Sequence, residues 1–368
     1  MKFICDGLNL SESLLKVSKA VGVKKLSHIL EGIKITAKGD ILTLVATDGE
    51  LTISKSMVAD VHLEGEIVVP GKYFTDFIKK LEKEQIEITL VEGSRIEIKY
   101  GDNVTYLACY DATNYPKIEE DLEQNNFVIM QKTFKDLLLR TVYAVATGDE
   151  MPYFKGCLLE SEGEDITCVG LDGSRIALTK RKMEKCPAKD FKAVVPGRTL
   201  SEIVRLIEKE EEELVVSIRK NSIKVVVGDT TVISKLYQNN FTNYKSIIPT
   251  NFNTQFTVNK KAFQNSIERL MLIYGAGEMP LVNAEIKENN LLMKAESEIG
   301  KINENLFIEM EGKDLSLGFV GKLIADYMRV CDGENITFYF NNSIMPFIIR
   351  ADNDQESLYL VLPTRINC

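Results

Sequence analysis

Residues 67–81 read IVVPGKYFTDFIKKL, and the same pattern returns twice further along the chain. The second copy is AVVPGRTLSEIVRLI at 193–207, and the third is LGFVGKLIADYMRVC at 317–331. The offsets are 126 and then 124 residues, so three units of this length account for the 368 residues. Each unit has the commonest size of an independently folding domain. A domain copied in series more often builds an extended surface than a single catalytic cleft.

A second block keeps nearly the same period. Residues 2–21 correspond to 126–145 and then to 255–274. Because two separate blocks share one spacing, we predict three copies of one module. The predicted modules comprise residues 1–121, 122–250 and 251–368, packed directly together, strand edge against strand edge.

Composition limits the class of protein. Apolar residues make up 45% and charged residues 27% of the chain, which is ordinary for a globular protein. No apolar run approaches the roughly 20 residues that span a bilayer, and no secretory signal is visible, so we expect a cytoplasmic protein without a membrane partner. The seven cysteines contain no Cys-x-x-Cys pair, which argues against a disulfide framework or a zinc site.

Each module combines strands with two amphipathic helices. The segments 42–54 and 166–179 alternate around an Asp-Gly turn and predict hairpins. Strands are also expected at 85–90 and 222–227. In the helix predicted over 132–147, one apolar face is formed by Phe134, Leu137, Leu138, Thr141 and Val145. About eight short strands and two helices per module predict an α+β fold with mainly antiparallel sheet.

Positive charge is concentrated in the helices. The six predicted helices cover residues 11–20, 71–81, 132–147, 197–207, 259–273 and 320–331. They hold 15 Lys and Arg but only 6 Asp and Glu, a net charge of +9 in a chain whose net charge is −9.

Two interpretations of this segregation stay open. Lys and Arg are good helix formers and collect in helices for that reason, although Glu is equally good and is the minority here. The alternative is that the helices share one face and contact a polyanion. Duplex DNA carries one charge per ~1.7 Å of its axis, so sparse Lys and Arg suffice for sequence-independent contact. No helix edge is rich enough in Asn, Gln and Arg to indicate base reading.

An enzyme is the competing hypothesis, and it finds little support. His28 and His62 are the only histidines and lack metal-ligand spacing. No phosphate-binding glycine loop is present, and no cofactor or metal is predicted. Asp48 and Asp172 recur, but at hairpin turns, where Asp is common for structural reasons. A repeat adaptor that binds only protein is a third possibility, which leaves the charge segregation unexplained.

Several short motifs resemble one family. They are LSHIL at 26–30, ATDG at 46–49, VPG at 69–71, NYPKI at 114–118, LDGSR at 171–175, SKL at 234–236 followed by Phe241 and Tyr244, and LPTR at 362–365. In this order, on a threefold repeat, they make the whole chain resemble the bacterial sliding clamp, the beta subunit of DNA polymerase III.

The resemblance implies a head-to-tail homodimeric ring of DNA-clamp modules. Antiparallel sheets lie outside, and two helices per module line a hole that encircles duplex DNA. The implied protein is a non-catalytic processivity factor with three kinds of partner: the polymerase III catalytic subunit, an ATP-dependent clamp loader, and other replication and repair proteins that carry short clamp-binding peptides. We expect it at the nucleoid in the cytoplasm. The predicted DNA contacts are Lys24 and Lys25, in a basic loop, and Lys16, Lys72, Lys79, Lys80, Lys135, Arg140, Arg198, Arg205, Lys260, Lys261 and Arg269.

The family also has one apolar peptide-docking groove per chain, between modules two and three. Its counterparts here are Phe154, Leu171, Gly173, Ser174, Arg175, Ile176, Thr242, Ser246, Ile247, Met279, Val320, Leu323, Ile344, Pro346, Leu360, Val361, Leu362, Pro363, Thr364 and Arg365. Leu171 and Ser174 replace the Thr and His that are frequent in the family. Thr242, Ser246, Leu323 and Thr364 replace a common Pro, Arg, Tyr and Met, which alters the ranking of partner peptides.

Ring closure in the family joins an edge strand of module one to module three of the partner. By this resemblance Tyr106 and Ala108 would meet Leu272 and Ile273.

Overall fold

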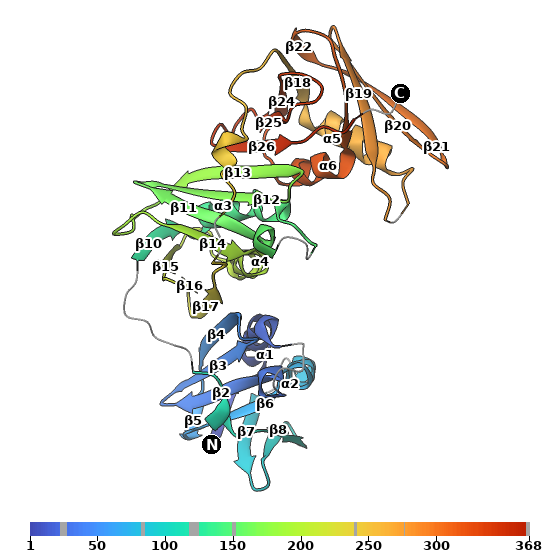
Figure 1. The fold of residues 1–368 in the computed structure, drawn as a ribbon. Coiled ribbons are helices and arrows are strands. Elements are labelled where there is room, and N and C mark those ends of the chain that lie inside the picture. The colour runs from blue at the N-terminus through green and yellow to red at the C-terminus, as the bar shows by residue number, and fades with distance from the viewer. Residues whose placement is uncertain are drawn as a thin grey trace. The chain divides into compact units, whose positions relative to one another are not determined.

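The computed structural model describes residues 1–22, 28–81, 85–117, 125–148, 152–238, 241–275 and 277–365 (Figure 1). The chain forms two compact units. The first unit comprises Met1–Lys132, Glu184–Lys189 and Glu202–Leu236. The second unit comprises Thr133–Met183, Asp190–Ser201 and Tyr237–Cys368.

The first unit contains two sheets. The five-stranded sheet has the order β5 (Asp60–Leu63), β1 (Lys2–Asp6), β7 (Gln85–Val91), β8 (Arg95–Tyr100), β9 (Asn103–Ala108). The eight-stranded sheet has the order β10 (Asn125–Met130), β15 (Glu213–Ile218), β16 (Ser222–Val227), β17 (Thr230–Lys235), β4 (Leu51–Val58), β3 (Ile41–Thr47), β2 (Gly32–Lys38), β6 (Gly65–Pro70).

The second unit contains the other two sheets. The nine-stranded sheet has the order β14 (Lys192–Pro196), β11 (Gly156–Glu162), β12 (Asp165–Leu171), β13 (Arg175–Lys182), β26 (Ser357–Val361), β25 (Phe347–Ala351), β24 (Asn335–Phe340), β18 (Thr254–Asn259), β22 (Glu309–Gly312). The four-stranded sheet has the order β21 (Gly300–Phe307), β20 (Asn290–Ser297), β19 (Leu281–Lys287), β23 (Leu315–Val320). Within the described residues every strand pair in the four sheets is antiparallel, so the predicted α+β fold is confirmed.

The part of the chain that the structure describes has six α-helices, two in each predicted module. They are α1 (Gly7–Val17), α2 (Gly71–Ile78), α3 (Gln131–Leu139), α4 (Gly197–Leu206), α5 (Lys260–Met271) and α6 (Gly321–Val330). Each helix begins directly after a strand. Helix α1 begins four residues before its predicted start, since the carboxylate of Asp6 caps it by accepting from Asn9 N at 2.8 Å.

Helix α3 is much shorter than the predicted helix over 132–147. It ends at Leu139, and the Thr141 hydroxyl donates back to the carbonyls of Leu137 and Leu138. A hydroxyl that satisfies carbonyls in this way competes with helix continuation, and the β-branched Val142 follows. Val145 therefore lies beyond the helix, and its predicted place on the helical face is wrong.

The Val-Pro-Gly motif has a steric cause. A Cβ on Gly71 would lie 2.9 Å from the Glu31 carbonyl oxygen, and a Cβ on Gly197 would lie 2.9 Å from that of Lys155. Glu31 and Lys155 both come immediately before the first strand of a hairpin pair, β2 or β11. Only glycine lets a helix start pass so close to a neighbouring backbone, which is why the motif repeats.

The modules are joined by pairing between sheet edges. We call the pairing of β17 with β4 the first joint and the pairing of β26 with β13 the second joint. Ser234 lies opposite Leu51 in the first, and Val361 lies opposite Arg175 in the second. The direct edge-to-edge packing predicted for consecutive modules is confirmed at both joints.

No helix among the described residues has the length and apolarity needed to cross a membrane. The same residues contain no group of three or more His, Cys, Asp or Glu arranged to hold a metal ion.

Substituting Gly197 tests the steric account of the motif. We expect Gly197→Ala to lower the free energy of unfolding by about 2 kcal/mol, because the new methyl meets a backbone oxygen that cannot move aside. Urea unfolding measures this change. Gly148→Ala is the control, since its Cβ meets nothing within 4 Å, and equal stability of the two variants would contradict the account.

Candidate nucleic-acid interface and docking groove

Helix α2 illustrates how the basic side chains are presented. Phe74 and Ile78 are fully buried, whereas Lys72 is exposed on the opposite face, as are Lys79 and Lys80 in the following 3-10 turn. None of these three lysines makes an ion pair with a described residue. The helical period thus separates a core face from a cationic face.

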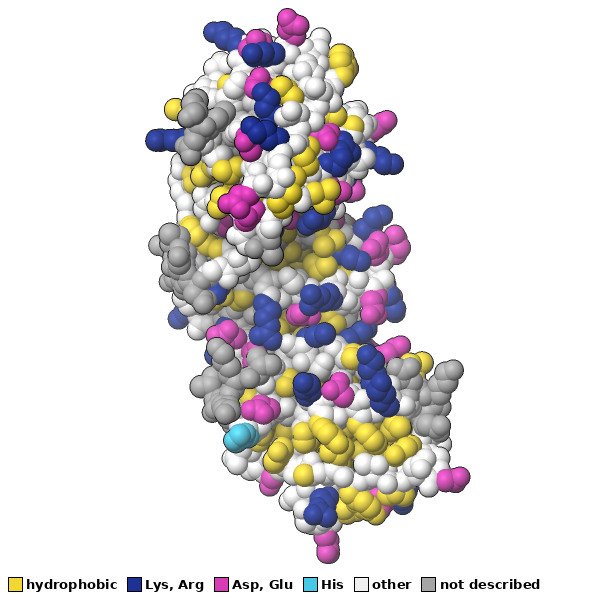
Figure 2. Space-filling view, turned by 90° about the vertical axis from the view of Figure 1, so that its right-hand side faces the viewer, with side chains coloured by type: hydrophobic (Ala, Val, Ile, Leu, Met, Phe, Trp, Pro, Cys, Tyr) yellow, Lys and Arg dark blue, Asp and Glu magenta, His cyan; other side chains and the backbone are white. Residues whose placement is uncertain are grey.

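Most predicted DNA contacts lie on accessible surface. The exposed ones are Lys72, Lys79, Lys80, Arg198, Arg205, Lys261 and Arg269, and the partly exposed ones are Lys16, Lys135, Arg140 and Lys260. Lys24 and Lys25 lie outside the described residues. Figure 2 shows Lys and Arg side chains dispersed over the visible face with Asp and Glu between them, not gathered in one patch.

Some of this positive charge is already neutralised within the chain. Lys16 Nζ lies 2.8 Å from Glu208 Oε2, and Arg269 Nη2 lies 2.5 Å from Glu304 Oε2. Arg205 pairs with Glu202. The exposed lysines of α2 and its following turn, together with Lys261, are therefore better candidates for contact with an external polyanion than these paired cations.

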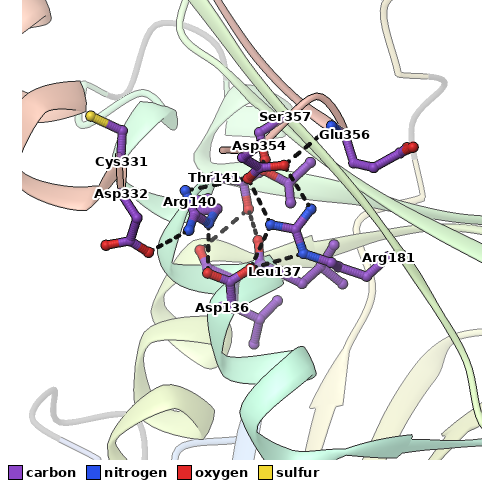
Figure 3. Close-up of polar contacts among 12 residues, drawn as sticks. Asp136, Leu137, Arg140, Thr141, Arg181, Cys331, Asp332, Asp354, Glu356 and Ser357 are labelled. Carbon is purple, nitrogen blue, oxygen red and sulfur yellow. Dashed lines mark hydrogen bonds and ion pairs between the residues drawn. The ribbon is translucent and has the colours of Figure 1, made fainter. Parts of the chain in front are cut away.

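Arg140 differs from the other candidates because it belongs to an internal ion cluster (Figure 3). Its side chain is only 9% exposed, and its Nε lies 2.5 Å from Asp136 Oδ1. Its Nη2 lies 2.6 Å from Asp332 Oδ2. Arg181 Nη2 lies 2.8 Å from Asp354 Oδ2. Since these carboxylates occupy the guanidinium, we leave Arg140 out of the DNA-contacting set and assign it to the second joint.

The cluster also controls the ionisation of Asp354. Burial alone would raise the pKa of this carboxyl group, but hydrogen bonds from Arg181 and Ser357 and the charge of Arg140 lower it below its ordinary value. The charged form of Asp354 therefore stabilises the folded chain.

The floor of the predicted groove is the outer face of the nine-stranded sheet. Ile176 lies opposite both Leu171 and Leu360 in the strand register, and all three are buried in one apolar cluster. Phe154 packs against this cluster. Val361 belongs instead to the core on the other face of the sheet, so its side chain does not line the floor.

The chain's last described residues connect the two halves of the groove. Leu362 N donates to Ser174 O at 2.9 Å, and Thr364 N donates to Gly318 O at 2.8 Å. Residues 362–364 thus extend from the β12–β13 turn to strand β23, whose last residue Val320 lies opposite Leu281. This path brings sequence positions almost two hundred residues apart into one surface.

The predicted groove residues fall into three classes of exposure. Exposed are Gly173, Ser174, Ser246, Ile247, Met279, Ile344, Leu362 and Arg365; partly exposed are Phe154, Thr242, Val320, Leu323, Pro346, Pro363 and Thr364; buried are Leu171, Arg175, Ile176, Leu360 and Val361. The exposed aliphatic side chains are bulky: Ile344 is 77% exposed and Met279 is 64% exposed. A protein with several such side chains near one groove is suited to an apolar ligand.

Arg175 fixes one end of the groove floor, and its guanidinium is not available to hydrogen-bond a peptide. Its guanidinium donates to Asp172 Oδ2 at 2.8 Å, to Asp326 Oδ2 at 2.9 Å and to the Tyr143 carbonyl at 2.8 Å. Arg175 is predicted as a pocket residue, and its internal partners give it a positioning role in the groove. Asp326 and Tyr143 gave no sequence signal for this contact.

Tyr244 holds the groove wall that carries Ser246 and Ile247. Its hydroxyl donates to the buried carboxylate of Glu160, which also lies 3.0 Å from Lys192 Nζ and 3.2 Å from Lys245 Nζ. Burial alone would raise the pKa of Glu160, but these three donors lower it. In the sequence Tyr244 stands out only as part of a family motif, and nothing there pairs it with Glu160.

The predicted dimer residues are separated in the single chain. Tyr106 and Ala108 are exposed on β9, the last strand of its sheet. Leu272 is 77% exposed just after α5, whereas Ile273 is buried in its own core. Of the latter two, Leu272 is the side chain available to a partner.

Repeated α+β modules, sheet edges joined in one register and basic helices define the class of DNA sliding clamps. Comparison with protein families supports this assignment. The models of the N-terminal, central and C-terminal domains of the DNA polymerase III beta subunit match residues 1–119, 128–243 and 245–365, respectively. The chain belongs to the DNA polymerase III beta subunit family.

Known members are similar over their whole length. The beta sliding clamp of Halalkalibacterium halodurans is 30% identical over 99% of this chain and 100% of the relative. The crystal structure of the Bacillus subtilis sliding clamp matches with a TM-score of 0.96 at 28% identity, covering 100% of both chains. A Pseudomonas aeruginosa sliding clamp bound to griselimycin matches with a TM-score of 0.94 at 25% identity, again covering 100% of both.

The ion cluster predicts a pH-dependent effect of Asp354→Asn. At neutral pH we expect the variant to lose about 3 kcal/mol of unfolding free energy, because the guanidinium groups of Arg140 and Arg181, with side chains 9% and 19% exposed, lose a charged partner. A carboxyl group with a lowered pKa stabilises the fold above its unfolded pKa and loses that effect as pH falls. The deficit should therefore shrink below pH 3.8, the ordinary value.

Urea unfolding across this pH range measures the deficit. Lys182→Ala, at an exposed ion pair with Glu164, is the control and should change stability little at any pH. A deficit for Asp354→Asn that is independent of pH would contradict the assignment.

Proposed function

We propose that two copies of this chain close head to tail into a ring around duplex DNA and act as a non-catalytic processivity factor. The ring slides without sequence specificity and tethers the DNA polymerase III catalytic subunit and other replication and repair proteins. An ATP-dependent loader opens and places it. The site of action is the nucleoid, in the cytoplasm.

The ring proposal rests on one observation. Two joints within the chain pair the corresponding sheet edges of consecutive modules, and the edges of the same type at β9 and β21 stay unpaired. Strand β9 corresponds to β17 and β26, and strand β21 corresponds to β4 and β13. Within the described residues β9 and β21 each end a sheet with one edge unpaired. Unpaired edges are templates for further pairing, so β9 of one copy fits β21 of a second copy. Two such contacts close a two-fold ring.

The two joints within the chain also specify the register of the third. When the register of these two joints is applied to the corresponding strands β9 and β21, Val104 lies opposite Asn303 and Thr105 lies opposite Ile302. Val104 and Asn303 are both exposed, and Thr105 and Ile302 are both only partly exposed, as expected if they face the helix side. A slip of one residue would exchange the two faces.

The residue that follows the first helix of modules two and three supports the proposed pairing of β9 with β21. At the second joint Tyr143 packs against Tyr359 of β26, with ring centroids 5.8 Å apart. Leu272 occupies the corresponding position of module three and is largely exposed. It would pack against the helix-side face of the incoming β9, which carries Thr105 at the position of Tyr359, whereas Tyr106 lies on the opposite face beside Glu97.

Enclosure explains why sparse cations are enough. A ring cannot leave circular DNA without opening, so phosphate contacts only need to centre the duplex, and strong contacts would slow sliding. Lys72, Lys79, Lys80 and Lys261 suit this role because they are exposed and make no ion pair with a described residue. An adaptor that binds only protein does not account for these lysines, and no described constellation suits catalysis.

The groove is the proposed docking site for partner peptides. An extended peptide with bulky apolar anchors matches its apolar floor and its exposed rim of Met279, Ile344 and Leu362. The Pseudomonas aeruginosa clamp bound to griselimycin supports a ligand site on this fold. Ser246 and Thr364 shape selectivity, since they replace larger family residues.

The ring is tested by retention on DNA of defined topology. After loading with ATP and a clamp loader, we expect the protein to stay on nicked circular plasmid during gel filtration and to be lost when the plasmid is cut once. Linear DNA with protein-blocked ends is the control and should retain it. Equal retention on circles and on free-ended linear DNA would contradict enclosure.

Cysteine pairs test the register of the third joint. We expect Val104→Cys with Asn303→Cys to form a covalent dimer under mild oxidation, since directly opposed residues meet disulfide geometry. Val104→Cys with Ile302→Cys is the matched control, because its side chains lie on opposite faces. Non-reducing electrophoresis, with the exposed Cys186 changed to Ser in all variants, reads the outcome. Equal cross-linking of both pairs would reject the register.

A further inference from the structure

A second hollow lies beside the groove on the outer face of the nine-stranded sheet. Its volume is about 420 Å³, and its apolar lining includes Ile248, Phe252, Tyr339, Ile348 and Leu358. Arg350 is its one charged lining residue among those described. A space of this size accommodates a large side chain with its backbone.

The hollow continues the floor of the groove. Ile176 of β13 lies opposite Leu360 of β26, Leu360 opposite Ile348 of β25, and Ile348 opposite Tyr339 of β24. The first two side chains belong to the groove and the last two to the hollow. All of them lie in or against one apolar cluster, which Ile248 also contacts.

The separation is short enough for a single extended peptide. Strands β26 and β24 are two strand spacings apart, about 10 Å, which about three extended residues cover. The chain also places the two sites next to each other, because Ile247 belongs to the groove and Ile248 lines the hollow. A ligand that fills the groove has its flanking residues at the hollow.

The charge of the hollow specifies part of its ligand. Arg350 Nη1 donates only to the Gln355 carbonyl, at 3.4 Å, and forms no ion pair with any described residue. A guanidinium at the edge of an apolar hollow favours a carboxylate on the ligand. The chain's own last described residues bond to β23 instead, and the proposed second copy uses β9 and β21, so neither fills the hollow.

We propose that the hollow binds the segment that flanks the docking motif of partner proteins, through one aromatic or large aliphatic side chain and an adjacent carboxylate. This inference rests on the proposed peptide groove. It makes the docking site of this chain longer than the groove alone. Partner peptides would then be ranked by their flanks as well as by their anchors.

Synthetic peptides test the longer site. The core probe is a pentapeptide with leucine at its second and fourth positions and phenylalanine at its fifth. It is compared with forms extended at either end by Gly-Gly-Phe-Glu or by four glycines. We expect the Phe-Glu extension at one end to tighten binding about tenfold in calorimetry, and the glycine extension to have no effect.

Two variants test whether the gain in affinity from the Phe-Glu extension arises at the hollow. Thr250→Trp places a bulky ring at the exposed rim of the hollow, and Arg350→Ala removes the charge; each should abolish most of the gain while core-probe affinity stays unchanged. If the core probe binds but neither extension helps, or if the gain survives Thr250→Trp, the hollow is not part of the site. Failure of the core probe to bind would overturn the proposed groove, and this inference with it.

Discussion

Backbone hydrogen bonding at sheet edges is the constraint on which the rest of this structure depends. A module whose sheets end in open edges exposes unpaired amide and carbonyl groups, and it must cover them or pair them. Here consecutive modules pair them in one register at two joints. The same constraint leaves β9 and β21 for a second copy. In the proposed assembly, ring closure is thus a consequence of the repeat, and it gives the basic helices their proposed role at DNA.

The three modules share the same strand pairing, but the side chains at the first and second joints differ. The second joint holds Arg140 and Arg181 in a cluster of carboxylates around the buried Asp354. At the first joint the position 124 residues before Arg140 is Lys16, and it lines an open polar crevice of about 620 Å³. Buried charges tolerate few alternative arrangements when every partner is satisfied, so the second joint is the more strictly specified. That joint lies beneath the proposed docking groove.

Sequence predicted the features that depend on local periodicity. The six helices, the Asp-Gly hairpins and the repeating glycine all follow from spacing and steric rules that act within a few residues. The prediction from sequence failed where a single side chain interrupts a helical pattern of apolar residues. The Thr141 hydroxyl, for example, ends α3 earlier than the pattern predicts. Sequence could not assign Arg140, because a cation with long-range carboxylate partners has the same local pattern as one that faces solvent. The same limit concealed the contacts of Arg175 and Tyr244, whose partners lie in distant segments.

The molar mass in solution tests the central claim most directly, because head-to-tail contacts either close or propagate. Light scattering coupled to gel filtration should give one species of about 83 kDa, twice the 41.4 kDa of one chain, independent of concentration in the micromolar range. A monomer at all concentrations would contradict pairing of β9 with β21. A ladder of growing oligomers would show that the contact forms without closing a ring.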